Sequence, residues 1–249
     1  MNNTPKILVV VSILAFVMVF MFIKPIAQDV EYHHFADQQS IFGIDNFWNV
    51  ISNAGFIISG VYGFIILRKY KIGSGIICSL FAGIILTGIG SAYYHYHPDN
   101  NTLVWDRLPM TIVFTSFFAQ LYAWYFDYKT ARWIWVISLG VGIISVFYWQ
   151  YTETLHRGDL RLYAFIQYVP MILMAIIMSR DAKHNTFLFK PLLAVMLFYI
   201  VAKIMEYYDV QIYNSIHINS GHSLKHIAAA IATYYMVVIV KKRMEKQIS

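Results

Sequence analysis

Residues 221–240 read GHSLKHIAAAIATYYMVVIV, and this stretch decides the class of fold. An α-helix needs roughly 20 predominantly apolar residues to cross the hydrocarbon core of a bilayer. From Ile227 to Val240 no residue carries a charge, and the polar side chains gather in the first turns instead. The stretch therefore predicts a transmembrane helix that presents polar residues at one membrane surface.

The composition of the whole chain agrees with this prediction. Of its 249 residues, 59% are hydrophobic and 13% are charged, against roughly a quarter charged in soluble domains, and the mean hydropathy is +0.55. So few charges cannot cover the surface of a soluble fold. Because lipid offers backbone groups no hydrogen-bond partner, the spans must be helical. We therefore expect an all-α integral membrane protein, and the single cysteine, Cys78, excludes a disulfide framework.

Apolar runs of sufficient length occur at eight places along the chain. They cover about residues 7–23, 47–67, 72–94, 108–126, 133–149, 162–179, 191–209 and 222–240. No internal repeat or long linker interrupts them, and the longest connection, about residues 24–46, is polar and acidic.

The distribution of Lys and Arg orients these spans, because cytoplasmic loops of membrane proteins carry an excess of both. With the N-terminus inside, four basic residues fall outside: Lys24, Arg107, Arg157 and Arg161. Thirteen fall inside: Lys6, Arg68, Lys69, Lys71, Lys129, Arg132, Arg180, Lys183, Lys190, Lys241, Lys242, Arg243 and Lys246. The split predicts a multi-pass protein with both termini in the cytoplasm. It also explains the net charge of +6, so we expect the bilayer and its lipids as partners, and not nucleic acid.

Residues 1–23 allow two interpretations, because a short basic start before an apolar run also describes a signal peptide. Lys24 to Ala27, which follow, make a poor small-residue cleavage site. We therefore expect a retained N-terminal membrane helix or uncleaved signal anchor, followed by an outer loop at residues 24–46.

Polar and ionisable residues within membrane spans mark functional sites. Ser91 and His95 lie four residues apart near the end of the third span, so they share a helix face. His222 and His226, also four apart, open the last span. This is the spacing by which a helix presents two imidazoles to one metal ion.

The expected topology brings these groups to one membrane depth. The third span ends on the outer side and the last span begins there. Asp106 stands just before the fourth span, whose first turn we expect to hold Pro109, a favoured position for proline. The carboxylate, the serine and the three histidines should therefore lie near the same outer face.

Three histidines with an open fourth position form the ligand set of a catalytic zinc site, in which bound water becomes a nucleophile near neutral pH. A nearby carboxylate such as Asp106 can accept a proton or orient a ligand, and the hydroxyl of Ser91 can donate to a developing oxyanion. The alternative for each histidine is an interfacial side chain bonded to a backbone carbonyl. That is our interpretation of the other six: His33, His34, His97, His156, His184 and His217.

Four motifs, in order along the chain, resemble those of the alkaline ceramidase family: FWNVISN at residues 47–53, Ser91-x-x-x-His95, Asp106 in DRLPM, and His222-x-x-x-His226. This family is part of a larger group of seven-helix membrane hydrolases that includes the adiponectin and progestin receptors. The resemblance spans about residues 30–240.

The resemblance implies a seven-helix hydrolase core at residues 47–240, with one additional N-terminal helix and a basic cytoplasmic tail at residues 241–249. It implies hydrolysis of the amide of ceramide, or of a ceramide-like lipid, to a sphingoid base and a fatty acid. It also implies residue roles: zinc ligands at His95, His222 and His226, an oxyanion stabiliser at Ser91, and a proton acceptor or orienting group at Asp106.

Eukaryotic members of this family bind calcium in the N-terminal loop. The loop here offers four carboxylates: Asp29, Glu31, Asp37 and Asp45. Asn46 stands before Phe47, where the family typically has Glu, so a calcium site stays unassigned. The pattern is closer to bacterial relatives, which favours a bacterial cytoplasmic membrane with the active site toward its outer (periplasmic or lumenal) face.

Two other function classes fit parts of the pattern. A receptor or signalling protein with a structural zinc would normally close the fourth metal position with a protein ligand. A transporter with a histidine-lined proton path would place polar residues through the full membrane depth. Within the bilayer, Lys203 and Glu206 are expected to form an i, i+3 ion pair; the alternative is that they recognise a polar lipid headgroup. Lys225 is expected to reach toward the interface.

Overall fold

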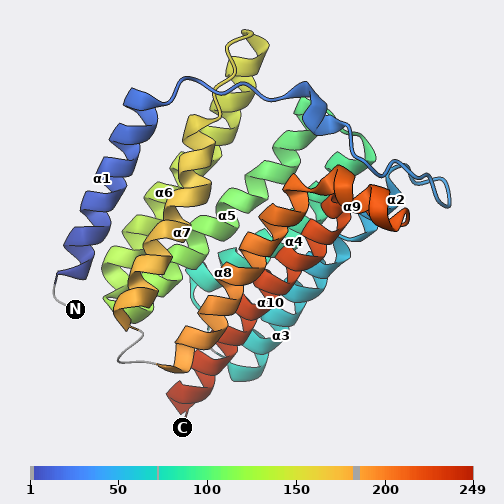
Figure 1. The fold of residues 1–249 in the computed structure, drawn as a ribbon. Helices are drawn as coiled ribbons and strands as arrows, with labels where there is room; N and C mark the ends of the chain where they lie inside the picture. Colours follow the sequence, from blue (N-terminus) through green and yellow to red (C-terminus); the bar gives the residue numbers. More distant parts are fainter. Residues whose placement is uncertain (1–2, 72, 182–185, 249) are drawn as a thin grey trace.

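The computed structural model describes residues 3–248, except residue 72 and residues 182–185. Figure 1 shows a single bundle of long helices. Its elements are α1 (Thr4–Phe22), the 3-10 helix η1 (Val30–His33), α2 (Phe47–Ile51), α3 (Ala54–Tyr70), α4 (Gly75–Tyr96), α5 (Asn100–Tyr125), α6 (Tyr128–Thr154), α7 (Arg161–Asp181), α8 (Thr186–Tyr207), α9 (Asp209–Ile216) and α10 (Gly221–Ile248).

Seven spans in the described part of the chain are long and apolar enough to cross a membrane, including N-terminal α1 and the continuous stretch Phe47–Tyr70. The remaining long helix, α5, has 26 residues but lower hydropathy. It packs against α4, α6 and α7, and its polar residues Thr115, Ser116 and Gln120 are buried. Because other helices surround α5, it does not need a uniformly apolar surface. Seven of the eight predicted spans correspond to one helix each, and residues 47–67 correspond to α2 and α3 together, which confirms the all-α membrane bundle.

The start of α5 differs from the prediction. Asp99 accepts a hydrogen bond from the backbone N–H of Thr102 (2.7 Å), and the Thr102 hydroxyl accepts one from the backbone N–H of Asp99 (3.1 Å). This capping box starts the helix at Asn100, well before the apolar run. Asp106 therefore lies inside α5 rather than ahead of it, and the placement of Pro109 in the first turn is wrong.

The interior proline helps α4 and α5 to approach closely. Pro109 has no backbone N–H, so it cannot donate a hydrogen bond to the carbonyl four residues earlier, that of Trp105. A Cβ built on Gly90 of α4 would overlap that same carbonyl oxygen. The absent side chain of Gly90 thus makes room for the Trp105 carbonyl, and the contact brings the last turns of α4 beside Asp106.

The N-terminal helix lies at the edge of the bundle, where α1 packs on α7 (Figure 1). The connection from α1 to α2 then crosses the end of the bundle. It is held there by a backbone bond from Leu160 N–H to the Ile26 carbonyl (2.9 Å) and by the Arg161 guanidinium, which donates to the Ile23 carbonyl (2.9 Å). The predicted outer loop therefore covers one end of the helices.

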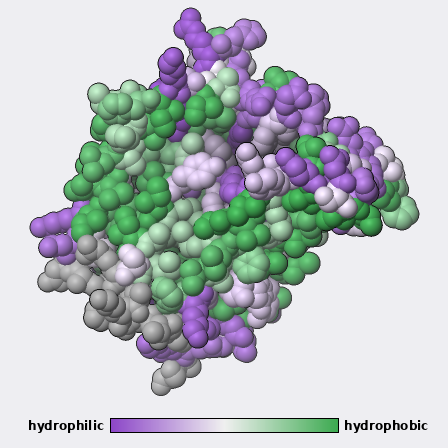
Figure 2. All heavy atoms as spheres, in the orientation of Figure 1, coloured by the Kyte–Doolittle hydropathy of each residue, from purple (hydrophilic) through white to green (hydrophobic). Residues whose placement is uncertain are grey.

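The surface of the protein is apolar between hydrophilic ends, as Figure 2 shows for one face. Large side chains such as Val10, Leu14, Ile58 and Ile144 are each more than half exposed. Such a surface is unfavourable in water and suited to lipid. The chain is thus a multi-pass membrane protein. Two residues discussed from the sequence, Lys183 and His184, lie outside the described residues.

Candidate metal centre and active site

The three histidines predicted to bind metal meet at one end of the bundle. His95 lies in the last turn of α4, and His222 and His226 lie in the first turns of α10. Each can offer one ring nitrogen, and these atoms lie within 4.8 Å of one another. All three residues are at most 5% exposed. They are positioned to bind a metal ion, and no other group of three His, Cys, Asp or Glu is so placed in the described part of the chain.

The ring nitrogens themselves fit a metal ion. Two nitrogens bound to one tetrahedral zinc stand roughly 3.4 Å apart, and Nε2 of His95 lies 3.1 Å from Nε2 of His226. Nδ1 of His95 is buried without a hydrogen-bond partner. The two nitrogens of one imidazole point in different directions and cannot both bind the same ion, so the short distance between the two Nε2 atoms is the observation that fits a shared metal.

Other side chains hold the histidines in place. The Ser52 hydroxyl lies 2.8 Å from Nδ1 of His226, the type of bond that orients a metal-binding imidazole. The Asp209 carboxylate accepts a hydrogen bond from the backbone N–H of His222 (2.6 Å). Neither supporting residue was singled out from the sequence, although Ser52 belongs to the FWNVISN motif. Ser52 and His226 are 174 residues apart and Asp209 precedes His222 by 13, so both roles depend on how the fold brings separate helices together.

The outer loop at residues 24–46 covers the histidines at the end of the bundle. The ring of Phe35 packs against His95 and His222, with centroid separations of 4.7 and 4.8 Å. His33 contacts the Tyr94 hydroxyl and the Asn100 side-chain oxygen, each at 3.0 Å, so its ring nitrogens meet side chains and not the predicted backbone carbonyl. The loop therefore contributes an apolar cover to the metal centre rather than a further ligand.

The acidic residues of the loop do not gather into a calcium site. Asp29 caps η1 by accepting from the backbone N–H of Glu31 (3.0 Å). Asp37 is buried, and this burial raises the pKa of its carboxyl. Among the described residues, the loop carboxylates form no group of three that could share a cation. Calcium therefore stays unassigned.

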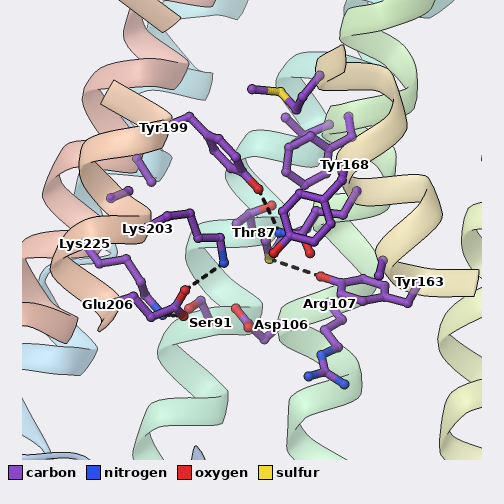
Figure 3. Close-up of a pocket in the computed structure, with 18 of the residues that line it drawn as sticks. Thr87, Ser91, Asp106, Arg107, Tyr163, Tyr168, Tyr199, Lys203, Glu206 and Lys225 are labelled. Atoms are coloured by element: carbon purple, nitrogen blue, oxygen red, sulfur yellow. Dashed lines mark hydrogen bonds and ion pairs between the residues drawn. The ribbon is translucent and has the colours of Figure 1, made fainter. Parts of the chain in front are cut away.

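Ser91 and Asp106 lie next to each other beside the histidines. Ser91 is one helical turn before His95 and is buried. Its hydroxyl lies within hydrogen-bonding reach of the Asp106 carboxylate, and Figure 3 shows both side chains facing the same pocket. The structure thus brings together all five residues that the sequence singled out.

Lys225 turns inward, so the prediction that it reaches toward the membrane interface is wrong. Its ammonium nitrogen lies 2.9 Å from Glu206 Oε1 and 2.9 Å from His222 Nε2. The predicted pair between Lys203 and Glu206 is confirmed, with 2.7 Å between Nζ and Oε2. Glu206 attracts Lys225 away from the interface because one carboxylate can bridge two ammonium groups.

A cavity of about 450 Å³ adjoins the metal centre. Ser91, Asp106 and His226 line its polar end, and apolar residues such as Phe114 and Met236 line the rest. Figure 3 shows the polar residues converging on this space from several helices, and Figure 2 shows hydrophilic atoms within a hollow of the apolar face. The cavity thus places an apolar chamber next to polar and metal-binding groups.

Arg107, which was predicted to lie outside the spans, is buried inside α5 and also lines this cavity. The guanidinium carbon of Arg107 lies 4.2 Å from the ring centroid of Trp149 and 5.1 Å from that of Tyr163, at distances typical of cation–π contacts. Its Nη2 donates to the Gln28 side chain at 2.5 Å. The aromatic partners lie on α6 and α7, so local sequence could not reveal this environment.

The fold and the site define a membrane-embedded, all-α protein with three buried histidines positioned to bind a metal ion beside a largely apolar cavity. The model of the ceramidase family matches residues 39–247, and the chain belongs to this family. The match confirms the resemblance, and membership makes the protein an amide hydrolase. No curated protein matches the chain.

Proposed function

We propose that this protein is a zinc-dependent intramembrane amidase that hydrolyses the amide of ceramide, or of a ceramide-like lipid, to a sphingoid base and a fatty acid. One observation carries the proposal. In a member of the ceramidase family, three buried histidines form a cluster, and one of them, His226, lines the same largely apolar cavity as Ser91 and Asp106.

Zinc is the metal that we assign to His95, His222 and His226. An all-histidine set of three with space for a fourth ligand is typical of catalytic zinc sites. When bound, zinc supplies a Lewis acid that polarises the carbonyl and activates water near neutral pH. The absence of a fourth His, Cys, Asp or Glu from the described cluster favours this catalytic role over the structural zinc of a receptor.

Asp106 and Ser91 supply the proton transfers and the charge stabilisation. The Asp106 carboxylate accepts a proton from the attacking water and then returns it to the leaving amine nitrogen. The Ser91 hydroxyl donates a hydrogen bond to the carbonyl oxygen as negative charge develops on it. Because Ser91 lies beside Asp106, one amide can reach both residues at once.

The cavity explains how a lipid amide reaches buried polar groups. Its apolar lining, including Phe114, Val195 and Met236, suits an acyl chain, while the amide needs the polar end. We assign this polar end to the outer face of the membrane, with both termini in the cytoplasm, from the distribution of Lys and Arg. A bacterial cytoplasmic membrane is part of the same proposal.

The test combines the metal content of the purified protein with turnover of a fluorescent ceramide before and after chelation. We expect about one zinc per chain, loss of turnover on chelation and recovery with added zinc. His222→Ala should lose both zinc and turnover, whereas His217→Ala, at the exposed end of α9, should keep both. Zinc without turnover of any lipid amide would favour the receptor function, and a protein that never binds zinc would contradict the proposal.

A further inference from the structure

Three charged residues form a cluster on the cavity wall, which we call the lysine–glutamate cluster: Lys203, Glu206 and Lys225. Lys203 and Glu206 lie on α8, and Lys225 lies on α10. Glu206 bridges the two ammonium groups, at 2.7 Å from Lys203 and 2.9 Å from Lys225. Because Lys225 also contacts His222, the cluster extends from the metal centre into the cavity.

The charges of the lysine–glutamate cluster do not balance. Lys203 and Lys225 contribute two positive charges, and the one carboxylate that both contact is Glu206. A metal ion at the histidines would add to this excess. In addition, Nη1 of Arg107 is buried without a partner. Uncompensated charge within a membrane is costly, so the excess indicates that an anion joins the site.

Lys203 is the member of the cluster that can accept another partner. Its side chain is 38% exposed, compared with 15% for Lys225 and 20% for Glu206. Figure 3 shows it extending from α8 toward the space that Ser91 and Asp106 face. An ammonium group has three donors, and Glu206 accepts one of them.

We propose that Lys203 binds an anionic group of the substrate and thereby selects amide-linked lipids whose amine half carries a phosphate or a carboxylate. This proposal rests on the amidase function. The anion belongs to the amine half because the acyl half is a hydrocarbon chain, for which the cavity offers Phe114, Val195 and Met236. The reaction is unchanged: water adds to the carbonyl carbon, the C–N bond breaks and the amine leaves with the proton.

The test compares Lys203→Gln with the wild type on three substrates with the same acyl chain: a neutral ceramide, its 1-phosphate and an N-acyl amino acid. A charge-assisted hydrogen bond is worth roughly tenfold or more in affinity. We expect the wild type to prefer at least one anionic substrate by about tenfold in kcat/KM, and Lys203→Gln to lose that preference. Turnover of neutral ceramide should fall much less than turnover of the anionic substrates, and zinc content should not change.

Lys190→Gln is the matched control, since Lys190 is exposed at the other end of α8 and should leave all three rates unaltered. Lys203→Arg should keep the preference for the anionic substrate. A wild type that prefers neutral ceramide, or a Lys203→Gln variant that slows all substrates equally, would overturn the proposal. The two anionic substrates distinguish a phosphate from a carboxylate as the bound group.

A binding measurement separates this proposal from the amidase function. An anionic analogue with an ether in place of the amide should bind the wild type about tenfold more tightly than Lys203→Gln. If no amide is hydrolysed but this difference is found, the amidase function fails and the anion site stands. If Lys203→Gln relieves inhibition by free fatty acid without altering substrate preference, the bound anion is the product carboxylate and the proposal is wrong.

Discussion

Asp106 shows how much a single residue here depends on its surroundings. It lies inside α5, within reach of the Ser91 hydroxyl, and it shares the cavity with His226 and Lys225. An ionised carboxylate is an acceptor only, through its two oxygens. At the scale of the residue, we therefore propose that Asp106 is the group that moves a proton between water and the amide nitrogen.

Replacing this carboxylate tests that role. Asp106→Asn keeps the shape of the side chain but cannot accept a proton, so we expect kcat/KM to fall by roughly 10²- to 10⁴-fold while zinc content stays near one per chain. Turnover of a lipid amide and metal analysis measure the two quantities. Asp45→Asn, at an exposed loop position, should have wild-type activity. Full turnover by Asp106→Asn would contradict a catalytic role for Asp106.

At the scale of the element, the contact between α4 and α5 positions the site. Gly90 accommodates the Trp105 carbonyl, and this keeps the Ser91–His95 end of α4 beside Asp106. The same two helices contain residues of all the proposed catalytic groups except the two histidines of α10. A shift of α4 relative to α5 would therefore increase the distance between the Ser91 and Asp106 side chains.

A methyl group at this contact should therefore be harmful. We expect Gly90→Ala to destabilise the protein by about 1–3 kcal/mol through overpacking, and to lower turnover as well. The matched control is Gly140→Ala in α6, where an added Cβ meets no atom within 4 Å. Alanine favours helices over glycine by up to about 1 kcal/mol. Gly140→Ala should therefore be at least as stable as the wild type. Thermal unfolding in detergent measures the stability of both variants. Equal stability of Gly90→Ala and Gly140→Ala would contradict a tight contact at Gly90.

The capping box of α5 predicts a dependence on pH. The backbone N–H of Thr102 donates to the Asp99 carboxylate and holds the pKa of Asp99 below its usual range. A lowered folded-state pKa stabilises the protein above the unfolded pKa of about 3.9, and this stabilisation is lost as the pH falls through the folded-state value. Asp99 should therefore stabilise α5 at neutral pH and cease to do so in acid.

Two substitutions separate the cap from its charge. Asp99→Ala should cost about 1 kcal/mol at pH 7. Asp99→Asn still caps the helix but does not titrate, so it should be close to wild type at pH 7 and lose less stability than wild type below about pH 4. Thermal unfolding at pH 7, 4 and 3 gives the comparison. Parallel pH profiles for Asp99→Asn and wild type would show that the Asp99 charge does not contribute.

At the scale of the whole molecule, the apolar surface between two hydrophilic ends defines how the bundle lies in a bilayer (Figure 2). The loop at residues 24–46 covers the end that holds the metal centre, and the exposed residues near Lys129 belong to the α5–α6 connection at the opposite end of α5. The proposed orientation assigns the first end to the outside and the second to the cytoplasm.

Labelling of single cysteines tests this orientation. In a Cys78→Ser background, Phe42→Cys, at a position 92% exposed in the outer loop, should react with a membrane-impermeant maleimide in intact cells. Lys129→Cys, which is also exposed, should react only after the membrane is permeabilised, because it is expected in the cytoplasm. The reverse pattern would place the active site on the cytoplasmic side.

The sequence by itself determined the membrane class, the helical spans and the three histidines that are positioned to bind a metal ion. These follow from local properties, namely the length and hydropathy of each run and the spacing of side chains on one helix face, as with His222 and His226. Only the tertiary structure decided the start of α5 at a polar capping box, the inward turn of Lys225 and the support of His226 by Ser52. The physical reason is that hydrogen bonds and ion pairs join whichever groups the fold brings together, and Ser52 and His226 are 174 residues apart.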